Sequence, residues 1–308
     1  MLRKKAVFWA LLGIIAIAFL FGIGRMLNPL SSPPDAERGW GQAVAVIYLE
    51  GAIVAGHGQQ AFFASLGGSD AVIRQLEQAK NDPDVGAVVL RINSPGGSAA
   101  ASQEIYNQAL RLKEAGKPLV ASFADVAASG GYWIACAADE IVANPASMTG
   151  SIGVIMEVTN FVELYEKLGI GSDVIKSGEH KDMGSASRPL DEGERLIMQS
   201  MVDDIYEQFL DVVTAGRNLS RDDVRELADG RIFTGRQAAK LGLVDRLGDL
   251  SDAVDRAGEL AGIAGRPRIK ELGIRSPLQL FLGSTGLNLP WPVSWLPNPD
   301  NGQMIYLR

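Results

Sequence analysis

The sequence predicts an α/β fold, in which a parallel β-sheet is covered by helices and is preceded by one N-terminal transmembrane helix. Two apolar runs, at 44–49 (VAVIYL) and 85–92 (VGAVVLRI), are typical of parallel strands that are buried on both faces. Segments with helical spacing of apolar residues alternate with these runs, which indicates strand-helix-strand units. Residues 6–24 are uncharged and mostly apolar, and a helix of this length spans roughly 28 Å, close to the hydrocarbon thickness of a bilayer.

The charges around this apolar segment predict its orientation. Arg3, Lys4 and Lys5 precede it and only Arg25 follows closely, so the positive-inside rule places the N-terminus in the cytoplasm. We therefore expect a single-pass protein of a bacterial-type inner (plasma) membrane, in contact with membrane lipid through residues 6–24 and with its main domain extracytoplasmic. A cleaved signal peptide is the alternative, but the apolar run is longer than usual for one and no clear small-x-small site follows it.

Proline content and the apolar pattern predict four segments. The anchor occupies 1–25, a proline-containing linker 26–41, a globular domain 42–265 and a Pro/Trp-rich C-terminal tail 266–308. Within the domain we expect, in order, a strand at 44–49, a helix at 69–82, a strand at 85–92, a helix that ends at Gly116, a strand at 118–122, a helix at 127–138, a strand at 140–143, a long helix from Asp191 to 218, and short helices at 220–230 and 234–241.

Charge and the scarcity of two residue types exclude several classes of protein. A formal net charge of −7 and a pI near 5.0 argue against a nucleic-acid partner. The single cysteine, Cys136, excludes an internal disulfide and a multi-cysteine metal site, and its apolar neighbours indicate a core position. His57 and His180 are the only histidines, so a Ser-His-Asp triad or a multi-histidine zinc site would have to use one of them. We expect no metal and no cofactor.

A glycine turn at 93–98 (NSPGGS) lies at the carboxyl end of a predicted strand, where open α/β sheets bind ligands. Gly96 and Gly97 let the backbone approach a substrate closely and present N–H groups to a developing oxyanion. A simple tight turn is the alternative. A phosphate-binding loop is disfavoured, because no Lys-Ser/Thr pair follows at the required spacing.

Two further motifs could supply a nucleophile and a base. In 148–153 (MTGSIG), glycines flank Ser151, so its hydroxyl can be exposed on a sharp turn while the N–H of Ile152 faces the same oxyanion. In 176–182 (KSGEHKD), Lys181 could activate a serine only if its pKa fell well below about 10.4. Lysines in such polar loops are usually solvated, so this motif is weak by itself.

Ser129 is a rival nucleophile. It lies at a turn into a predicted helix, in 127–132 (AASGGY). No histidine lies between His57 and His180 to act as its base. We therefore expect Ser129 to be a helix N-cap that packs beside the site.

Four motifs in this order and spacing, NSPGGS, AASGGYW, ANPASMTGSIGV and SGEHKD, resemble the signal peptide peptidase A family of the single-length type. The resemblance covers roughly 44–260 and implies that 42–265 is a peptidase domain of the crotonase/Clp-protease-like fold. It also implies a serine endopeptidase that acts on remnant signal peptides and other short apolar peptides, as a homo-oligomer with active sites at subunit interfaces. Transferred residue by residue, it makes Ser151 the nucleophile, Lys181 the general base with Lys176 as the fallback, and Gly96, Gly97 and Ile152 the oxyanion-hole residues.

Two other functions stay open at this point. A crotonase-like acyl-CoA hydratase or isomerase would use the same oxyanion turn, but it would need bound CoA and a pair of acid/base carboxylates. A non-catalytic membrane scaffold would bind its partners through the oligomer and would need no nucleophile.

Overall fold

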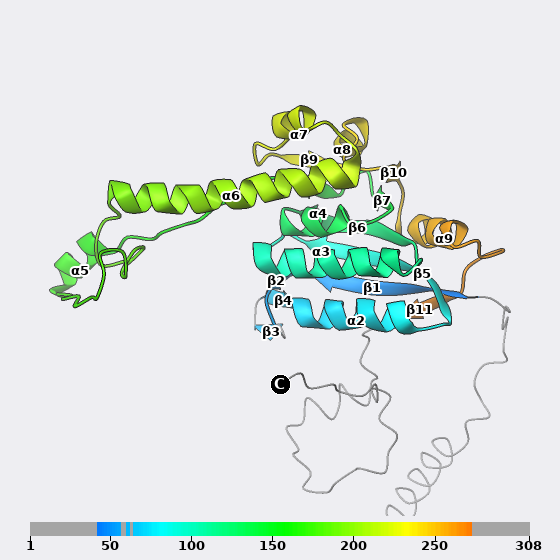
Figure 1. Cartoon of the computed structure of the whole chain (residues 1–308), viewed down its shortest axis with the longest axis horizontal. Helices are drawn as coiled ribbons and strands as arrows, with labels where there is room; N and C mark the ends of the chain where they lie inside the picture. The colour runs from blue at the N-terminus through cyan, green and yellow to red at the C-terminus, as the bar shows by residue number, and fades with distance from the viewer. Residues whose placement is uncertain (1–41, 57–59, 62–63, 273–308) are drawn as a thin grey trace, which may run out of the picture. The chain divides into compact units, whose positions relative to one another are not determined.

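The computed structural model describes residues 42–56, 60–61 and 64–272 (Figure 1). The predicted anchor at 1–25, the linker at 26–41, most of the tail at 266–308 and His57 lie outside the described residues. Among the helices that are described, none has the length and apolar character needed to cross a bilayer.

The main sheet is mostly parallel, as predicted. In the described part of the chain its strands follow the order β10-β7-β6-β5-β1-β11, and β8 pairs with the end of β6 on one side and antiparallel with β9 on the other. The strands of this sheet are β1 (Ala43–Glu50), β5 (Val85–Ser94), β6 (Leu119–Ala128), β7 (Glu140–Ala143), β8 (Met148–Gly150), β9 (Ile232–Thr234), β10 (Arg246–Leu247) and β11 (Ile269–Glu271). A small second sheet holds β2 (Ala52–Val54), β4 (Ala64–Gly68) and β3 (Gln60–Ala61).

Helices cover both faces of the main sheet, which explains the continuous apolar runs. Along β1, Ile47 and Leu49 belong to the larger core with residues of α2, α3 and α4, whereas Val44 and Val46 pack with residues of α9 (Figure 1). The helices are α2 (Ser69–Asn81), α3 (Ala99–Glu114), α4 (Gly130–Ala135), α5 (Val162–Leu168), α6 (Glu192–Arg217), α7 (Arg221–Leu227), α8 (Gly235–Lys240) and α9 (Leu250–Leu260).

One prediction about these elements was wrong. We expected a strand at 118–122 and a helix at 127–138, but β6 continues to Ala128 and α4 is confined to Gly130–Ala135. The end of β6 is extended because Val126, Ala127 and Ala128 pair with β8. This neighbour is distant in sequence, so local propensity did not reveal it.

The long predicted helix is confirmed as α6, and local capping explains its bounds. The Asp191 side chain accepts a hydrogen bond from the Glu194 amide, while the Glu194 side chain accepts one from the Asp191 amide. Asn218, in the left-handed conformation (φ 51°), ends the helix.

The segment 154–201, which we call the arm, contains α5 and the first part of α6 (Figure 1). Only Glu194 is buried in it, although it carries many large apolar side chains. Those exposed on the arm are Ile155, Met156, Phe161, Leu164, Leu168, Ile170, Val174, Ile175, Leu196, Ile197 and Met201. Monomeric soluble proteins rarely leave so much apolar surface uncovered in one segment.

Candidate active site

Two serines lie side by side where β6 and β8 end. Ala128 and Gly150 are register partners in these neighbouring parallel strands, and Ser129 and Ser151 directly follow them. Both serines have positive φ, 52° for Ser129 and 50° for Ser151. Residues with a side chain rarely adopt this conformation, so the surrounding contacts must hold both turns in place.

Backbone hydrogen bonds fix the turn at Ser151. Its amide donates to the Arg231 carbonyl oxygen (2.8 Å), and the carbonyl of Gly150 accepts from the Ser129 amide (2.9 Å). Gly150 has φ of +81°, and a Cβ there would lie 2.6 Å from the Phe233 ring. Glycine is therefore required before the serine, and the half-buried Ser151 side chain is held at the edge of a cavity.

The glycine turn lies against β2. The Ile53 amide donates to the Gly96 carbonyl and the Ser98 amide donates to the Ile53 carbonyl, both at 2.9 Å. The Gly96 amide is occupied, because it donates to Ser94 Oγ (3.1 Å). No residue that the structure describes accepts from the Gly97 amide, which leaves it free for a substrate oxygen.

Ile152 follows the serine, and its side chain is fully buried. Its carbonyl accepts from the Gly230 amide (3.1 Å), whereas its own amide has no acceptor in the described chain. Of the three predicted oxyanion-hole residues, Gly97 and Ile152 thus retain unpaired amides and Gly96 does not. Gly96 and Gly97 line the cavity with Ser151, and Ile152 does not.

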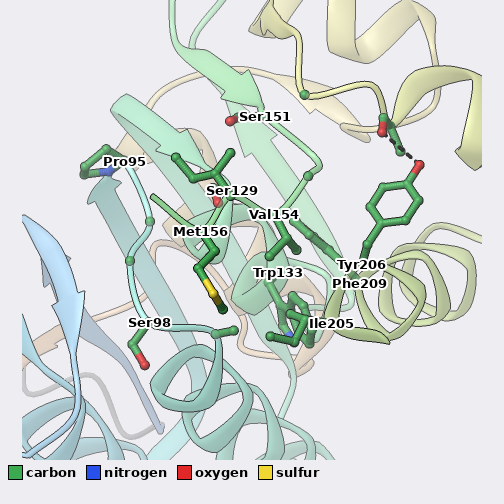
Figure 2. Close-up of a pocket in the computed structure, with 18 of the residues that line it drawn as sticks. Pro95, Ser98, Ser129, Trp133, Ser151, Val154, Met156, Ile205, Tyr206 and Phe209 are labelled. Atoms are coloured by element: carbon green, nitrogen blue, oxygen red, sulfur yellow. Dashed lines mark hydrogen bonds between the residues drawn. The ribbon is translucent and has the colours of Figure 1, made fainter. Parts of the chain in front are cut away.

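The cavity has a volume of about 840 Å³. Its far end is apolar, with the rings of Trp133 and Phe209 4.8 Å apart (Figure 2). The Trp133 indole N–H donates to Gln103 Oε1 (2.9 Å), and the Tyr206 hydroxyl donates to the Ala228 carbonyl (2.9 Å), so the polar atoms of both side chains are paired. Such a cavity suits an apolar side chain at its far end and a polar backbone at the serine end.

Asp229 is the acidic residue among the described residues of the cavity wall, and it lies two positions before Arg231, whose backbone holds Ser151. Hydrogen bonds from Arg231 lower the pKa of Asp229 to about 2, so the carboxylate is ionised at neutral pH. The same Arg231 supplies the carbonyl that accepts from Ser151. Sequence reasoning missed this segment, for which the Asp-Gly pair at 229–230 was the available signal.

The predicted base does not line the cavity of its own chain. Lys181 lies on an exposed turn of the arm, and no side chain or backbone group in the described residues pairs with its ammonium. Lys176, the fallback, donates to Asp182 Oδ1 and to the Glu179 carbonyl, both at 2.7 Å. His180 is exposed on the same turn. Among the described residues that line this cavity there is no lysine, arginine or histidine.

Asp182 is the centre of an ion-pair network in the arm. Hydrogen bonds from Arg188 and then Lys176 hold the pKa of Asp182 well below its ordinary value. Arg188 also pairs with the buried Glu194 at the start of α6. The Lys176 ammonium is therefore paired within this network, whereas no group in the described residues pairs with the Lys181 ammonium.

Two minor predictions concern Cys136 and Ser129. Cys136 is fully buried, as predicted, and burial raises the pKa of its thiol to about 12. Ser129 occupies the N-cap position of α4 and lines the cavity beside Ser151, as predicted, although its side chain makes no capping hydrogen bond. Within the described residues, no group of three or more His, Cys, Asp or Glu side chains could hold a metal ion.

Known proteins resemble this chain over much of the domain. Residues 111–264 match Peptidase family S49. A Synechocystis protein provisionally named a protease is 48% identical over 193 residues, 63% of this chain and 69% of that protein. A protein of Enterococcus faecium provisionally named signal peptide peptidase SppA is 42% identical over 183 residues, 59% of this chain and 53% of that protein. Protease 4 of Haemophilus influenzae is 38% identical over 217 residues, 70% of this chain and 34% of that protein.

Among solved structures, a ClpP1 mutant from Listeria monocytogenes is similar, with a TM-score of 0.43 and 16% identity over 69% of this chain and 94% of that one. This likeness is too distant to carry an argument about the site or its assembly.

Proposed function

We propose that this chain is a membrane-anchored endopeptidase with a Ser151–Lys181 dyad. The chain belongs to peptidase family S49, which is the signal peptide peptidase A family that its motifs predicted, and it is therefore a serine-type peptidase. Its substrates would be remnant signal peptides and other short apolar peptides. The observation that carries the proposal is the strained turn at Ser151, which holds the serine at a cavity beside the unpaired Gly97 amide.

The cavity supports an apolar peptide as the substrate. Its far end is formed by Trp133, Ile205 and Phe209, whereas the serine end offers backbone groups of the glycine turn. A peptide laid along this turn as an added strand would place an apolar side chain in the far end and its carbonyl beside Ser151.

The reaction would follow the general scheme of an activated serine. Neutral Lys181 takes the proton of the Ser151 hydroxyl, and the oxygen attacks the peptide carbonyl, whose oxyanion accepts from the amides of Gly97 and Ile152. The lysine then protonates the leaving amine, and an acyl-enzyme remains on the serine. Water activated by the same lysine hydrolyses this ester and regenerates the free enzyme.

We propose that Lys181 reaches Ser151 from a neighbouring subunit of a homo-oligomer. The cavity has no basic side chain of its own among its described lining residues, and Lys181 is unpaired on an exposed arm. The exposed apolar side chains of the arm would be covered by the neighbouring copy. Packing against a second copy would also shield the lysine from water.

Single variants test the dyad. Ser151→Ala and Lys181→Ala should each abolish hydrolysis of an apolar peptide while leaving the circular dichroism spectrum unchanged. Lys167→Ala, at another exposed lysine of the arm, is the matched control and should retain full turnover. Turnover that survives in either dyad variant would refute the assignment of that residue.

Mixing the two inactive variants tests where the lysine comes from. In a mixed oligomer, Ser151 of a Lys181→Ala subunit can meet Lys181 of a Ser151→Ala subunit, so activity should return after the subunits exchange. Mixed oligomers that stay inactive would show that the dyad lies within one subunit.

The membrane anchor needs a separate test, because it rests on the sequence alone. Full-length protein should remain with the membrane fraction after a carbonate wash, and protein that lacks residues 1–25 should be released. No observation in the structure favours an acyl-CoA hydratase or a silent scaffold.

A further inference from the structure

The segment 228–231 pairs with the turn that carries the proposed nucleophile. The antiparallel pairing of β8 with β9 continues beyond both strands, since the Ser151 amide donates to the Arg231 carbonyl (2.8 Å). One residue further on, the Gly230 amide donates to the Ile152 carbonyl (3.1 Å). The backbone position of Ser151 therefore depends on how the segment 228–231 is held.

Two side chains hold this segment. At its start, the Tyr206 hydroxyl donates to the Ala228 carbonyl (2.9 Å), the contact drawn as a dashed line in Figure 2. Towards its end, Asp229 Oδ1 accepts from the Arg231 amide (3.1 Å), which is an Asx turn, in which a side chain replaces a backbone acceptor. Gly230, at the centre of this turn, has φ of +87°, a conformation that glycine adopts readily.

The Asp229 carboxylate also binds the Arg231 side chain. Its Oδ1 and Oδ2 accept from Arg231 Nε (2.7 and 2.8 Å), and Oδ2 accepts from Nη2 as well. One carboxylate thus binds both the amide and the guanidinium of the same residue. Rotation of the Arg231 backbone would break at least one of these contacts, so its carbonyl oxygen is held in a fixed direction.

Stability alone does not account for this arrangement. The side chains of Asp229 and Arg231 are 48% and 60% exposed, and ion pairs this exposed contribute little to the free energy of unfolding. The atom that they fix has a use in the site, because the Arg231 carbonyl is the acceptor for the Ser151 amide. Ser151 has a strained φ of 50°, and such a turn persists only where its neighbours impose it.

We propose that Asp229 is a positioning residue for the nucleophile. This inference rests on the proposed function, in which the Ser151 hydroxyl attacks a peptide carbonyl. The Asp229 carboxylate directs the Arg231 carbonyl towards the Ser151 amide, and that hydrogen bond holds the serine at the edge of the cavity. Asp229 acts through the backbone of Arg231 and takes no part in proton transfer.

Two substitutions isolate the hydrogen bond from the Arg231 amide. Asp229→Ala removes the charge and the acceptor, whereas Asp229→Asn removes the charge and keeps an oxygen that can close the Asx turn. A misplacement of about 1 Å can lower a rate about 100-fold, so kcat of Asp229→Ala should fall roughly 10- to 100-fold with KM unchanged. Asp229→Asn should retain most of the wild-type kcat, and its intact mass after the assay excludes deamidation at position 229.

Labelling with a fluorophosphonate supplies a second readout, because this probe reacts with the serine without binding as a peptide. Its rate of reaction with Ser151 should fall in Asp229→Ala by a factor similar to that in kcat, and should stay near wild type in Asp229→Asn. If Asp229 contacted the peptide instead, KM would rise and the labelling rate would not change. That result, or equal losses of kcat in the two Asp229 variants, would overturn the positioning role.

Asp211→Ala is the matched control, because Asp211 forms another exposed ion pair, with Arg221, and is not among the described residues that line the cavity. It should keep the wild-type kcat and labelling rate. A kcat that follows the melting temperature across all three variants would indicate a purely structural role and overturn the inference. If Ser151→Ala is inactive and Asp229→Ala matches wild type, Ser151 stands as the nucleophile and the positioning role fails. If Ser151→Ala retains turnover, the proposed function itself fails.

Discussion

Gly97→Ala tests whether the glycine turn is held by β2 as the structure indicates. A Cβ at Gly97 would lie 2.1 Å from the Ile53 carbonyl oxygen, which is closer than two unbonded atoms can approach. The turn must therefore move away from Ile53. That movement breaks the hydrogen bonds from the Ile53 amide to Gly96 and from the Ser98 amide to Ile53.

The expected magnitude follows from these contacts. Two backbone hydrogen bonds contribute together about 2 kcal/mol, and a positive φ at a residue with a side chain costs about 1 kcal/mol more. Gly97→Ala should thus lower the free energy of unfolding by about 3 kcal/mol and the melting temperature by roughly 6–12 °C for a domain of this size. Hydrolysis should fall as well, because the Gly97 amide moves with the turn.

Gly116→Ala is the matched control. Gly116 also has a positive φ (+85°), but a Cβ there would meet nothing within 4 Å. It should lose only about 1 kcal/mol, a shift of roughly 2–4 °C, and keep full activity. Differential scanning calorimetry and a peptide-hydrolysis assay on both variants measure the difference. Equal shifts in melting temperature for the two variants would refute the reasoning.

Three further predictions concern stability and reactivity. Hydrogen bonds from Arg256 lower the pKa of Glu140, so the pair stabilises the protein above the unfolded carboxyl pKa of about 4.3. Wild type should be more stable than Glu140→Gln at pH 7, with the advantage lost as the pH falls below about 4, measured by urea denaturation. Cys136, buried and with a pKa raised to about 12, should react with Ellman's reagent at pH 8 only after denaturation. Tyr132→Phe should cost about 1–3 kcal/mol, because the Leu243 carbonyl loses its buried donor.

Each of these has a contrary outcome. An advantage over Glu140→Gln that persists unchanged at pH 3 would contradict the depressed pKa. Rapid labelling of native Cys136 would contradict its burial. The control for Tyr132→Phe is Tyr165→Phe on the arm, where the hydroxyl has no hydrogen-bond partner among the described residues. Equal stability losses in these two variants would show that the Leu243 hydrogen bond contributes nothing.

Local sequence predicted those elements whose limits are set by nearby residues. β7 (Glu140–Ala143) begins and ends where it was predicted, and β1 and β5 extend the predicted apolar runs by one or two residues. α6 begins at the capping box of Asp191 and Glu194, which is a local signal. The wrong limits of β6 have a different origin, since its last residues pair with a strand about 20 positions further along the chain.

For the site, the sequence alone determined that Ser151 lies between glycines at the end of a strand and that no histidine can serve the rival Ser129. Only the tertiary structure decided which groups meet there. It joins the glycine turn, the ends of β6 and β8 and the side chains of α6 around one cavity, and it leaves Lys181 off that cavity on an exposed arm. The physical reason is that strand pairing and helix packing bring together residues from distant parts of the chain, whereas composition, spacing and capping report only on neighbours in sequence.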